Sequence, residues 1–210
     1  MPVDLDALLE PSQTALVLME CQEGIIGEGG KLSALADAVK RHGTIAQIAR
    51  VLAAARTKGV PVFHCQMARR PDGGGAVANC LLLAATRKSE RPLLPGSPQQ
   101  AAVAALAPVD GEWVVARYHG ITPFHGTELD QLLRNLGIRT VVAVGVSVNV
   151  GILGLTIEAV NAGYQVVIPR EAVTGTPDEY VAAVMEHTLR LLATLAPVDE
   201  VVARWRDQGR

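Results

Sequence analysis

Short hydrophobic runs along the chain alternate with longer stretches in which hydrophobic positions recur every three or four residues. The short runs are nearly continuous, as expected for strands that a parallel sheet buries on both faces. They lie at residues 14–20, 60–65, 113–117, 140–146 and 165–169. The longer stretches have the spacing of amphipathic helices. They lie at residues 42–58, 127–136, 151–162 and 178–194.

Strands that alternate with helices favour right-handed crossovers and a parallel sheet covered by helices on both faces. Gly59, Gly137 and Gly163 each follow a predicted helix and are typical helix ends. Thr176 or Pro177 starts the last helix. No internal repeat or change of composition divides the chain. The sequence therefore predicts one α/β domain over residues 1–210, with three αβα layers around a mostly parallel central sheet.

The segment 67–99 departs from this alternation, because glycine and proline interrupt every stretch of it. We expect a long excursion over the edge of the sheet. It is either a surface loop or a functional element, such as a lid or a contact between subunits.

Composition narrows the classes of partner. The chain is 49% hydrophobic and 19% charged, which is an ordinary globular balance, and its formal net charge of −2 does not attract nucleic acid or membranes. Aromatic residues make up only 3%, too few for base-stacking platforms. No apolar run approaches the roughly 20 residues that span a bilayer, and the acidic N-terminal residues do not resemble a signal peptide.

The cysteines Cys21, Cys65 and Cys80 are odd in number and irregularly spaced, which fits a reducing compartment rather than a disulfide framework. No CxxC or HxxxH pair suggests a zinc site. We therefore expect a cytoplasmic protein that acts on a small molecule, without a metal or cofactor.

Charged residues follow two of the predicted strands. In an open parallel sheet, ligands bind beyond the carboxyl ends of the strands. Glu20 and Arg117 finish the first and third strands, and the second strand ends at His64, Cys65 and Gln66. A charge at such a position is costly unless it is paired or used. We expect Glu20 and Arg117 to pair within a pocket; in the alternative, both turn outward into water.

The turn after the fourth strand is a second candidate. Its sequence, GVSVNVG, leads from a strand into a helix, where free backbone amides and the helix dipole favour an anion. Ser147 or Asn149 can cap this helix. The alternative is an ordinary capped turn without a ligand.

Three stretches of the chain resemble the isochorismatase-like hydrolases, also called cysteine hydrolases. They are TALVLMECQEGI, WVVARYHGITPFHGTELDQLLRNLGI and TVVAVGVSVNVGILGLTIEAVNAGYQVVIPREA, and together the likeness covers residues 12–195. The resemblance implies the three-layer fold, hydrolase activity and assembly into dimers or tetramers. Gln22, Phe124, Thr127 and Leu129 match the pattern of the family.

The likeness breaks at the catalytic positions. The family's catalytic Asp aligns with Glu20, its Lys with Arg117 and its nucleophilic Cys with Gly151. Family members that hydrolyse isochorismate also lack the cysteine, often with glycine in its place, and use the acid to protonate a vinyl ether. Because Glu and Arg are longer than Asp and Lys, we expect a bidentate pair to fill part of the space that the cysteine side chain would occupy.

Other nucleophiles are less favourable. Cys21 follows Glu20 and Cys65 follows His64, and neighbours on a strand point to opposite faces, so both thiols are expected in the core. Cys80 lies in the excursion without a partner nearby in the sequence. His119 and His125 lie near the predicted pocket, where each either contacts substrate or stays solvated.

The residues therefore predict a hydrolase of a small, anionic metabolite that forms no thioester intermediate. Glu20, Arg117 and Gly151 are the predicted catalytic residues. The predicted substrate-binding residues are Gln22, His119, Phe124, Ser147 and Asn149. The alternative is a non-catalytic relative that binds a small ligand in the same pocket. Cysteine amidase chemistry is disfavoured by Gly151.

Overall fold

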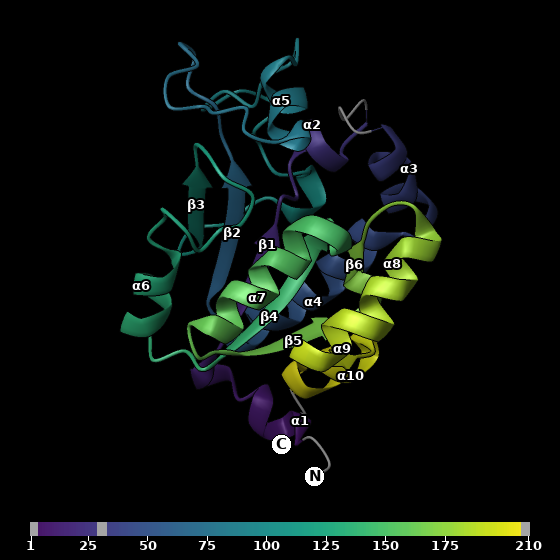
Figure 1. Cartoon of the computed structure of the whole chain (residues 1–210). Coiled ribbons are helices and arrows are strands. Elements are labelled where there is room, and N and C mark those ends of the chain that lie inside the picture. Colours follow the sequence, from purple (N-terminus) through teal and green to yellow (C-terminus); the bar gives the residue numbers. More distant parts are fainter. Residues whose placement is uncertain (1–3, 29–32, 207–210) are drawn as a thin grey trace.

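The computed structural model describes residues 4–28 and 33–206. Within these residues, a seven-stranded sheet forms the centre of the molecule, with the order β3-β2-β1-β4-β5-β7 and with β6 beside β4 (Figure 1). Every pairing between these strands is parallel. The strands are β1 (Thr14–Met19), β2 (Val62–Met67), β3 (Trp113–Arg117), β4 (Thr140–Val146), β5 (Gln165–Pro169), β6 (Val173–Thr174) and β7 (Thr194–Ala196).

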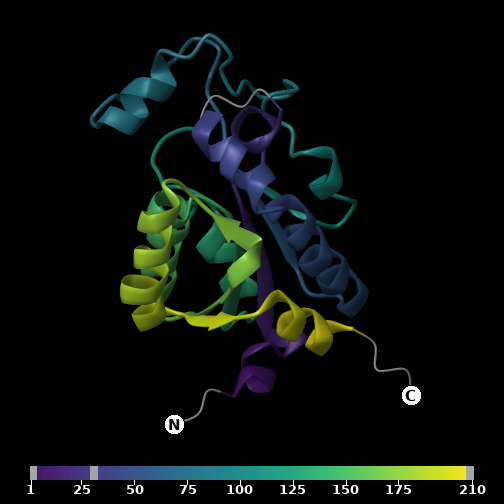
Figure 2. The same cartoon turned by 90° about the vertical axis from the view of Figure 1, so that its right-hand side faces the viewer.

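Helices cover both faces of the sheet, as Figure 2 shows with the sheet seen nearly edge-on. One layer contains α3 (Ser33–Arg41), α4 (Thr44–Lys58) and α10 (Val198–Trp205). The other contains α6 (Leu129–Asn135), α7 (Leu153–Asn161), α8 (Asp178–Val184) and α9 (Arg190–Leu192). The short helices α1 (Leu5–Leu8), α2 (Glu23–Ile26) and α5 (Leu81–Arg87) lie beyond the ends of the strands. None of the described helices is long and apolar enough to cross a membrane. The predicted three-layer fold is confirmed.

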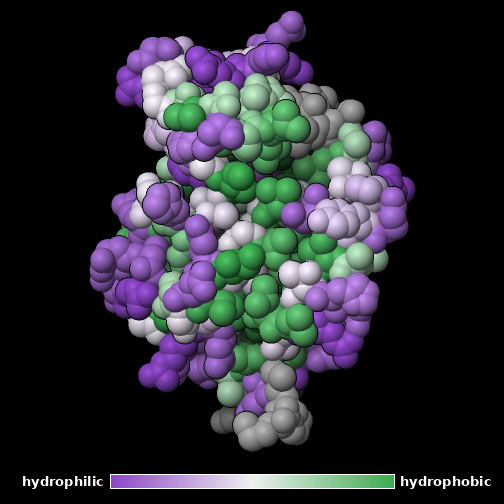
Figure 3. Space-filling view, in the orientation of Figure 1, coloured by the Kyte–Doolittle hydropathy of each residue, from purple (hydrophilic) through white to green (hydrophobic). Residues whose placement is uncertain are grey.

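The continuous apolar runs are explained by burial on both sides of the sheet. In β1, Leu16 and Leu18 pack with Ile48 of α4, whereas Val17 and Met19 belong to the cluster on the opposite face. On the side shown in Figure 3, hydrophobic surface gathers over α7, whose Ile157 and Val160 stay exposed.

Several boundaries differ from the predicted ones. The strand predicted at residues 60–65 is β2, which begins two residues later, because the Val60 amide closes the end of α4 by donating to the Ala55 carbonyl (2.9 Å) and Pro61 has no N–H. Gly59 ends α4 with a φ of 69°, as predicted. The helix predicted over residues 178–194 consists of α8, a π-helical turn and α9, and its last residue starts β7.

Candidate active site

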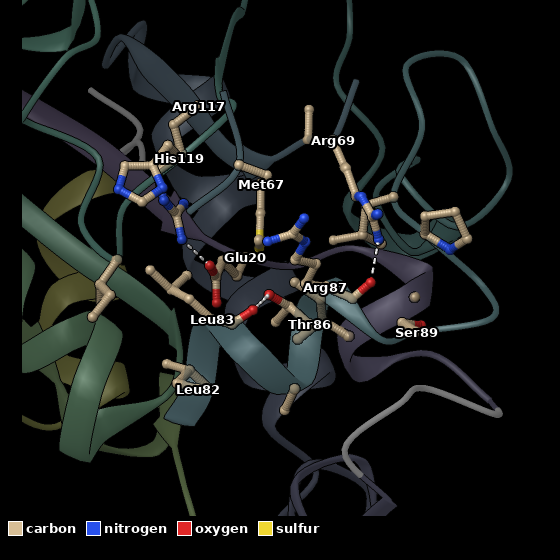
Figure 4. A pocket seen from close by; sticks show the side chains of 18 of the residues that line it. Glu20, Met67, Arg69, Leu82, Leu83, Thr86, Arg87, Ser89, Arg117 and His119 are labelled. Carbon is tan, nitrogen blue, oxygen red and sulfur yellow. Dashed lines mark hydrogen bonds and ion pairs between the residues drawn. The ribbon is translucent and has the colours of Figure 1, made fainter. Parts of the chain in front are cut away.

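A cavity of about 470 Å³ lies at the carboxyl ends of β1, β2, β3 and β4. Its floor includes Glu20, Arg117, Ser147 and Gly151, which three separate strands bring together across more than a hundred residues of sequence. The roof is formed by the excursion and its helix α5 (Figure 4). The cavity therefore lies where ligands of open parallel sheets bind, beyond the carboxyl ends of the strands. Five of the predicted site residues line it: Glu20, Arg117, Gly151, His119 and Ser147.

Glu20 is the first residue after β1, and its backbone has a φ of 53°. Its amide donates to the Cys65 carbonyl (2.9 Å), which completes the pairing of β1 with β2. Left-handed backbone is costly for a residue with a side chain, and such residues concentrate at functional sites. Glu20 turns the chain here so that its carboxylate faces the cavity, while the following residue, Cys21, returns to the core.

Arg117 ends β3 and is only 4% exposed. Its Nη2 donates to Glu20 Oε1, and its Nε donates to the carbonyl of Gly120 (3.2 Å). The predicted pairing is therefore observed, but the expected bidentate geometry is wrong, since Nε is used by the backbone of the loop that follows β3. Within the part of the chain that the structure describes, Nη1 is buried without a hydrogen-bond partner. One buried donor thus remains unused beside the cavity.

The turn from β4 into α7 is a π-helical turn over Val148–Ile152. Ser147 occupies the N-cap position, but its side chain makes no capping hydrogen bond, so the predicted cap is not formed. The amides of Val150 and Ile152 both donate to the Ser147 carbonyl (3.2 and 2.9 Å), so neither is free for an anion. Asn149 does not line the cavity, and its Oδ1 is buried without a partner among the described residues.

The space next to the α-carbon of Gly151 is limited by Val146 and Met19. A Cβ added to Gly151 would lie 2.8 Å from the Val146 carbonyl oxygen and 3.0 Å from Met19 Cε. These two groups are its nearest neighbours, and Glu20 and Arg117 are not among the three nearest atoms. The end of β1 and the backbone of β4 therefore limit the space for a Cβ at this position, and the idea that the longer pair fills the space of a cysteine side chain stays a prediction.

Two predicted substrate-binding residues have structural contacts instead. Gln22 is fully buried; its amide donates to the Met67 carbonyl (2.8 Å) and accepts from the Met67 amide (2.8 Å). Phe124 packs against Tyr164 at a centroid distance of 5.9 Å. Neither of them lines the cavity.

The excursion is a wall of the cavity rather than a detached loop. Met67, Leu82, Leu83 and Arg87 all line it, and Leu83 is the buried residue of α5. Arg69 Nη1 donates to the carbonyl of Arg87 at the end of this helix (2.7 Å). One feature of the sequence indicates this wall: the apolar triplet 81–83 lies within a segment otherwise rich in glycine and proline.

The cysteines do not present a nucleophile to the cavity. Burial raises the pKa of the Cys65 thiol to about 12, and burial followed by the nearby Glu20 charge raises that of Cys21 still further. Cys21 and Cys65 do not line the cavity, and neither does the exposed Cys80. Reactive cysteines need a stabilised thiolate, and the two buried thiols have the opposite environment.

Comparisons with known proteins agree with this architecture. The family model described as Isochorismatase domain matches residues 14–200. The isochorismatase family protein YecD of Escherichia coli O157:H7 is 29% identical over 195 residues, which cover 92% of this chain and 97% of YecD. Ureidoacrylate amidohydrolase RutB of Rhizobium rhizogenes is 35% identical over 68% of this chain, and the match spans 62% of RutB. An isochorismatase family protein of Desulfovibrio vulgaris superposes with a TM-score of 0.79 at 27% identity, covering 91% of this chain and 98% of that one.

Proposed function

Because this chain belongs to the isochorismatase family of hydrolases, we propose that it hydrolyses a small anionic metabolite without a cysteine nucleophile. In this proposal Glu20 transfers the proton, Arg117 stabilises negative charge, and Ser147 and Gly151 border the space for the reacting atoms.

The observation that carries the proposal is the setting of Glu20. Its carboxylate faces a cavity from strained backbone, and its partner is a buried arginine with one donor left unpaired. Strain and unsatisfied polar groups are expected where function requires them, since a purely structural pair is better satisfied. The absence of a side chain at Gly151, together with the buried thiols, supports a route without a covalent thioester.

The chemistry follows from the ion pair. A carboxylate beside a cavity can act as a general base that accepts a proton from water. In the proposed reaction, Glu20 removes a proton from a water molecule, the resulting hydroxide attacks the substrate, and Glu20 returns the proton to the leaving group. The Arg117 guanidinium supplies the positive charge that stabilises oxygen charge as it develops during attack.

A substrate screen tests this proposal. It contains carboxylate-bearing amides, esters and vinyl ethers, and amides are included because the similar protein RutB is named as an amidohydrolase. Any hit is assayed with wild type, Glu20→Gln and Glu179→Gln. Glu179 is an exposed glutamate on α8 outside the cavity, so its change controls for loss of a carboxylate in general.

We expect Glu20→Gln to lower kcat by roughly 10²–10⁴-fold, the usual contribution of a general base, and Glu179→Gln to leave it unchanged. Full turnover in Glu20→Gln would refute the assignment of Glu20. Ligand-induced stabilisation without turnover of any compound would favour the alternative, a non-catalytic binding protein.

A further inference from the structure

Arg87 is the last residue of α5; it is exposed, and its side chain lines the cavity near Met67 and Glu20 (Figure 4). Among the described residues, its guanidinium forms no hydrogen bond or ion pair. Its backbone carbonyl accepts the hydrogen bond from Arg69 Nη1, so the end of the helix is held while the guanidinium stays unused. A planar guanidinium with free donors matches a carboxylate through two parallel N–H···O bonds.

Other charged residues also line the cavity. Arg117 is paired with Glu20, and Arg69, Glu90 and Arg91 are contributed by the excursion. Arginines therefore outnumber carboxylates in the lining, which favours a negatively charged ligand. Arg87, whose guanidinium has no partner among the described residues, is placed to meet a carboxylate.

The remaining walls are apolar. They are contributed by Met67, Leu82, Leu83, Leu93, Ile121 and Val150. Such walls favour an apolar body, because its transfer from water is favourable in proportion to the area buried. We propose that Arg87 is the specificity-determining residue of this cavity and binds the carboxylate of a small ligand with an apolar body. This inference rests on the proposed function, since it names the substrate class of the same site.

Binding of matched pairs of compounds tests the inference by calorimetry, without any need for turnover. The probes are benzoate, 3-methylbutanoate and cyclohexanecarboxylate, each compared with its neutral amide. We expect at least one carboxylate to bind wild type more tightly than its amide. Arg87→Gln should weaken that carboxylate by about 10- to 100-fold, the range of a hydrogen bond to a charged group, and leave the amide unchanged. Arg87→Lys should restore part of the loss.

Arg70→Gln is the matched control, because Arg70 belongs to the same segment but pairs with Asp72 (2.9 and 2.7 Å) outside the cavity. It should not change either affinity. The inference is overturned if no carboxylate binds wild type more tightly than its amide. It is also overturned if Arg87→Gln and Arg70→Gln weaken the carboxylate equally.

Glu20→Gln separates this inference from the proposed function. Because it removes a negative charge from the cavity, it should keep carboxylate binding or tighten it. Turnover that depends on Glu20 but shows no preference for carboxylates would overturn the role of Arg87 alone. Carboxylate binding through Arg87 without Glu20-dependent turnover would overturn the hydrolase proposal alone.

Discussion

Two carboxylates, the partly buried Glu20 and the more deeply buried Glu112, each pair with an arginine, yet their hydrogen bonds differ greatly in number. Glu112 precedes β3 and is 7% exposed. It accepts hydrogen bonds from Arg56 Nε (2.7 Å) and Nη2 (2.9 Å), from His64 Nε2 (2.8 Å) and from the Val109 amide (3.0 Å). Glu20 has one side-chain partner, Arg117, and lies on strained backbone beside a cavity.

This difference distinguishes a carboxylate that stabilises the fold, Glu112, from one that can act on a ligand, Glu20. Burial alone would raise the pKa of Glu112, but the hydrogen bonds from Arg56, His64 and Val109 outweigh it and lower the pKa to about 2. The oxygens of that carboxylate accept hydrogen bonds from within the fold, so none is available to a ligand. Glu20 keeps an oxygen available at the cavity. A buried ion pair by itself therefore does not identify an active site; incomplete satisfaction beside a cavity does.

The largest expected effect is the loss of stability in Glu112→Ala. Removing this carboxylate leaves Arg56 without its partner and His64 without its acceptor. We expect about 3 kcal/mol of destabilisation, at the lower end of the range for fully buried pairs because Arg56 is 31% exposed. Urea unfolding of Glu112→Ala and Glu20→Ala measures the contrast. A greater loss in Glu20→Ala would reverse the comparison.

Acid unfolding should show the same contrast over a defined pH range. The folded-state pKa of Glu112 lies below its ordinary value of 4.5, so its contribution is complete above pH 4.5 and is lost as the pH falls towards about 2. We expect a loss of up to about 3 kcal/mol in wild type. Burial also lowers the pKa of His64, which adds a loss that begins as the pH falls below its ordinary value of 6.5.

Glu112→Gln is the informative variant for this effect. Its unfolding free energy should fall much less than that of wild type between pH 4.5 and pH 2.5. Identical pH dependence in wild type and Glu112→Gln would show that Glu112 is not the group responsible.

On the cavity side, Gly151→Ala should destabilise the protein by about 1–3 kcal/mol, the usual cost of overpacking. The added methyl group meets the Val146 carbonyl and the end of Met19. Met19→Val removes one of these contacts, so we expect the cost of Gly151→Ala to be smaller in a Met19→Val background. If Glu20→Asp with Arg117→Lys relieves the cost instead, then the ion pair does fill this space.

The coupling between Glu20 and Arg117 should be smaller, about 1–2 kcal/mol, since only one hydrogen bond joins them. A double-mutant cycle with Glu20→Gln and Arg117→Met measures it by urea unfolding. The double variant should recover part of the loss caused by Glu20→Gln, because no buried guanidinium is then left unpaired. Strictly additive losses would show that the pair makes no energetic contribution.

The predictions that succeeded depended on local pattern. The strands β3, β4 and β5 fall at the predicted residues, because each is an unbroken apolar run, although the edge strand β3 leaves Trp113 and Val114 exposed. Because ligands bind beyond the carboxyl ends of parallel strands, the strand ends also predicted that Glu20 and Arg117 lie together. The helix α10 was not predicted although its residues 198–205 are amphipathic, and β7 was absorbed into the preceding helix because its apolar residues continue the same pattern.

Features of the site that the sequence pattern did not predict depend on contacts between distant residues. Gly151 meets Met19 only because β1 and β4 pair with Met19 opposite Gly145. Arg87 reaches the cavity because Arg69 holds the end of α5, a contact that no periodicity within the excursion reveals. Register and loop placement are set by the whole fold, so the pattern of the sequence located the site but not its boundaries.

The smallest expected effect is that of thiol alkylation, which should leave the cavity unchanged. Iodoacetamide should modify the exposed Cys80 and spare Cys21 and Cys65, because burial raises the pKa of both thiols and limits access to them. Mass spectrometry identifies the sites, and the affinity for the tightest-binding carboxylate probe is measured before and after treatment. Cys80→Ser serves as the control that should take up no label under native conditions. Modification of Cys65, together with loss of carboxylate binding that the probe itself prevents, would mean that the thiol beside His64 reaches the cavity. The proposal that catalysis needs no thiol would then have to be abandoned.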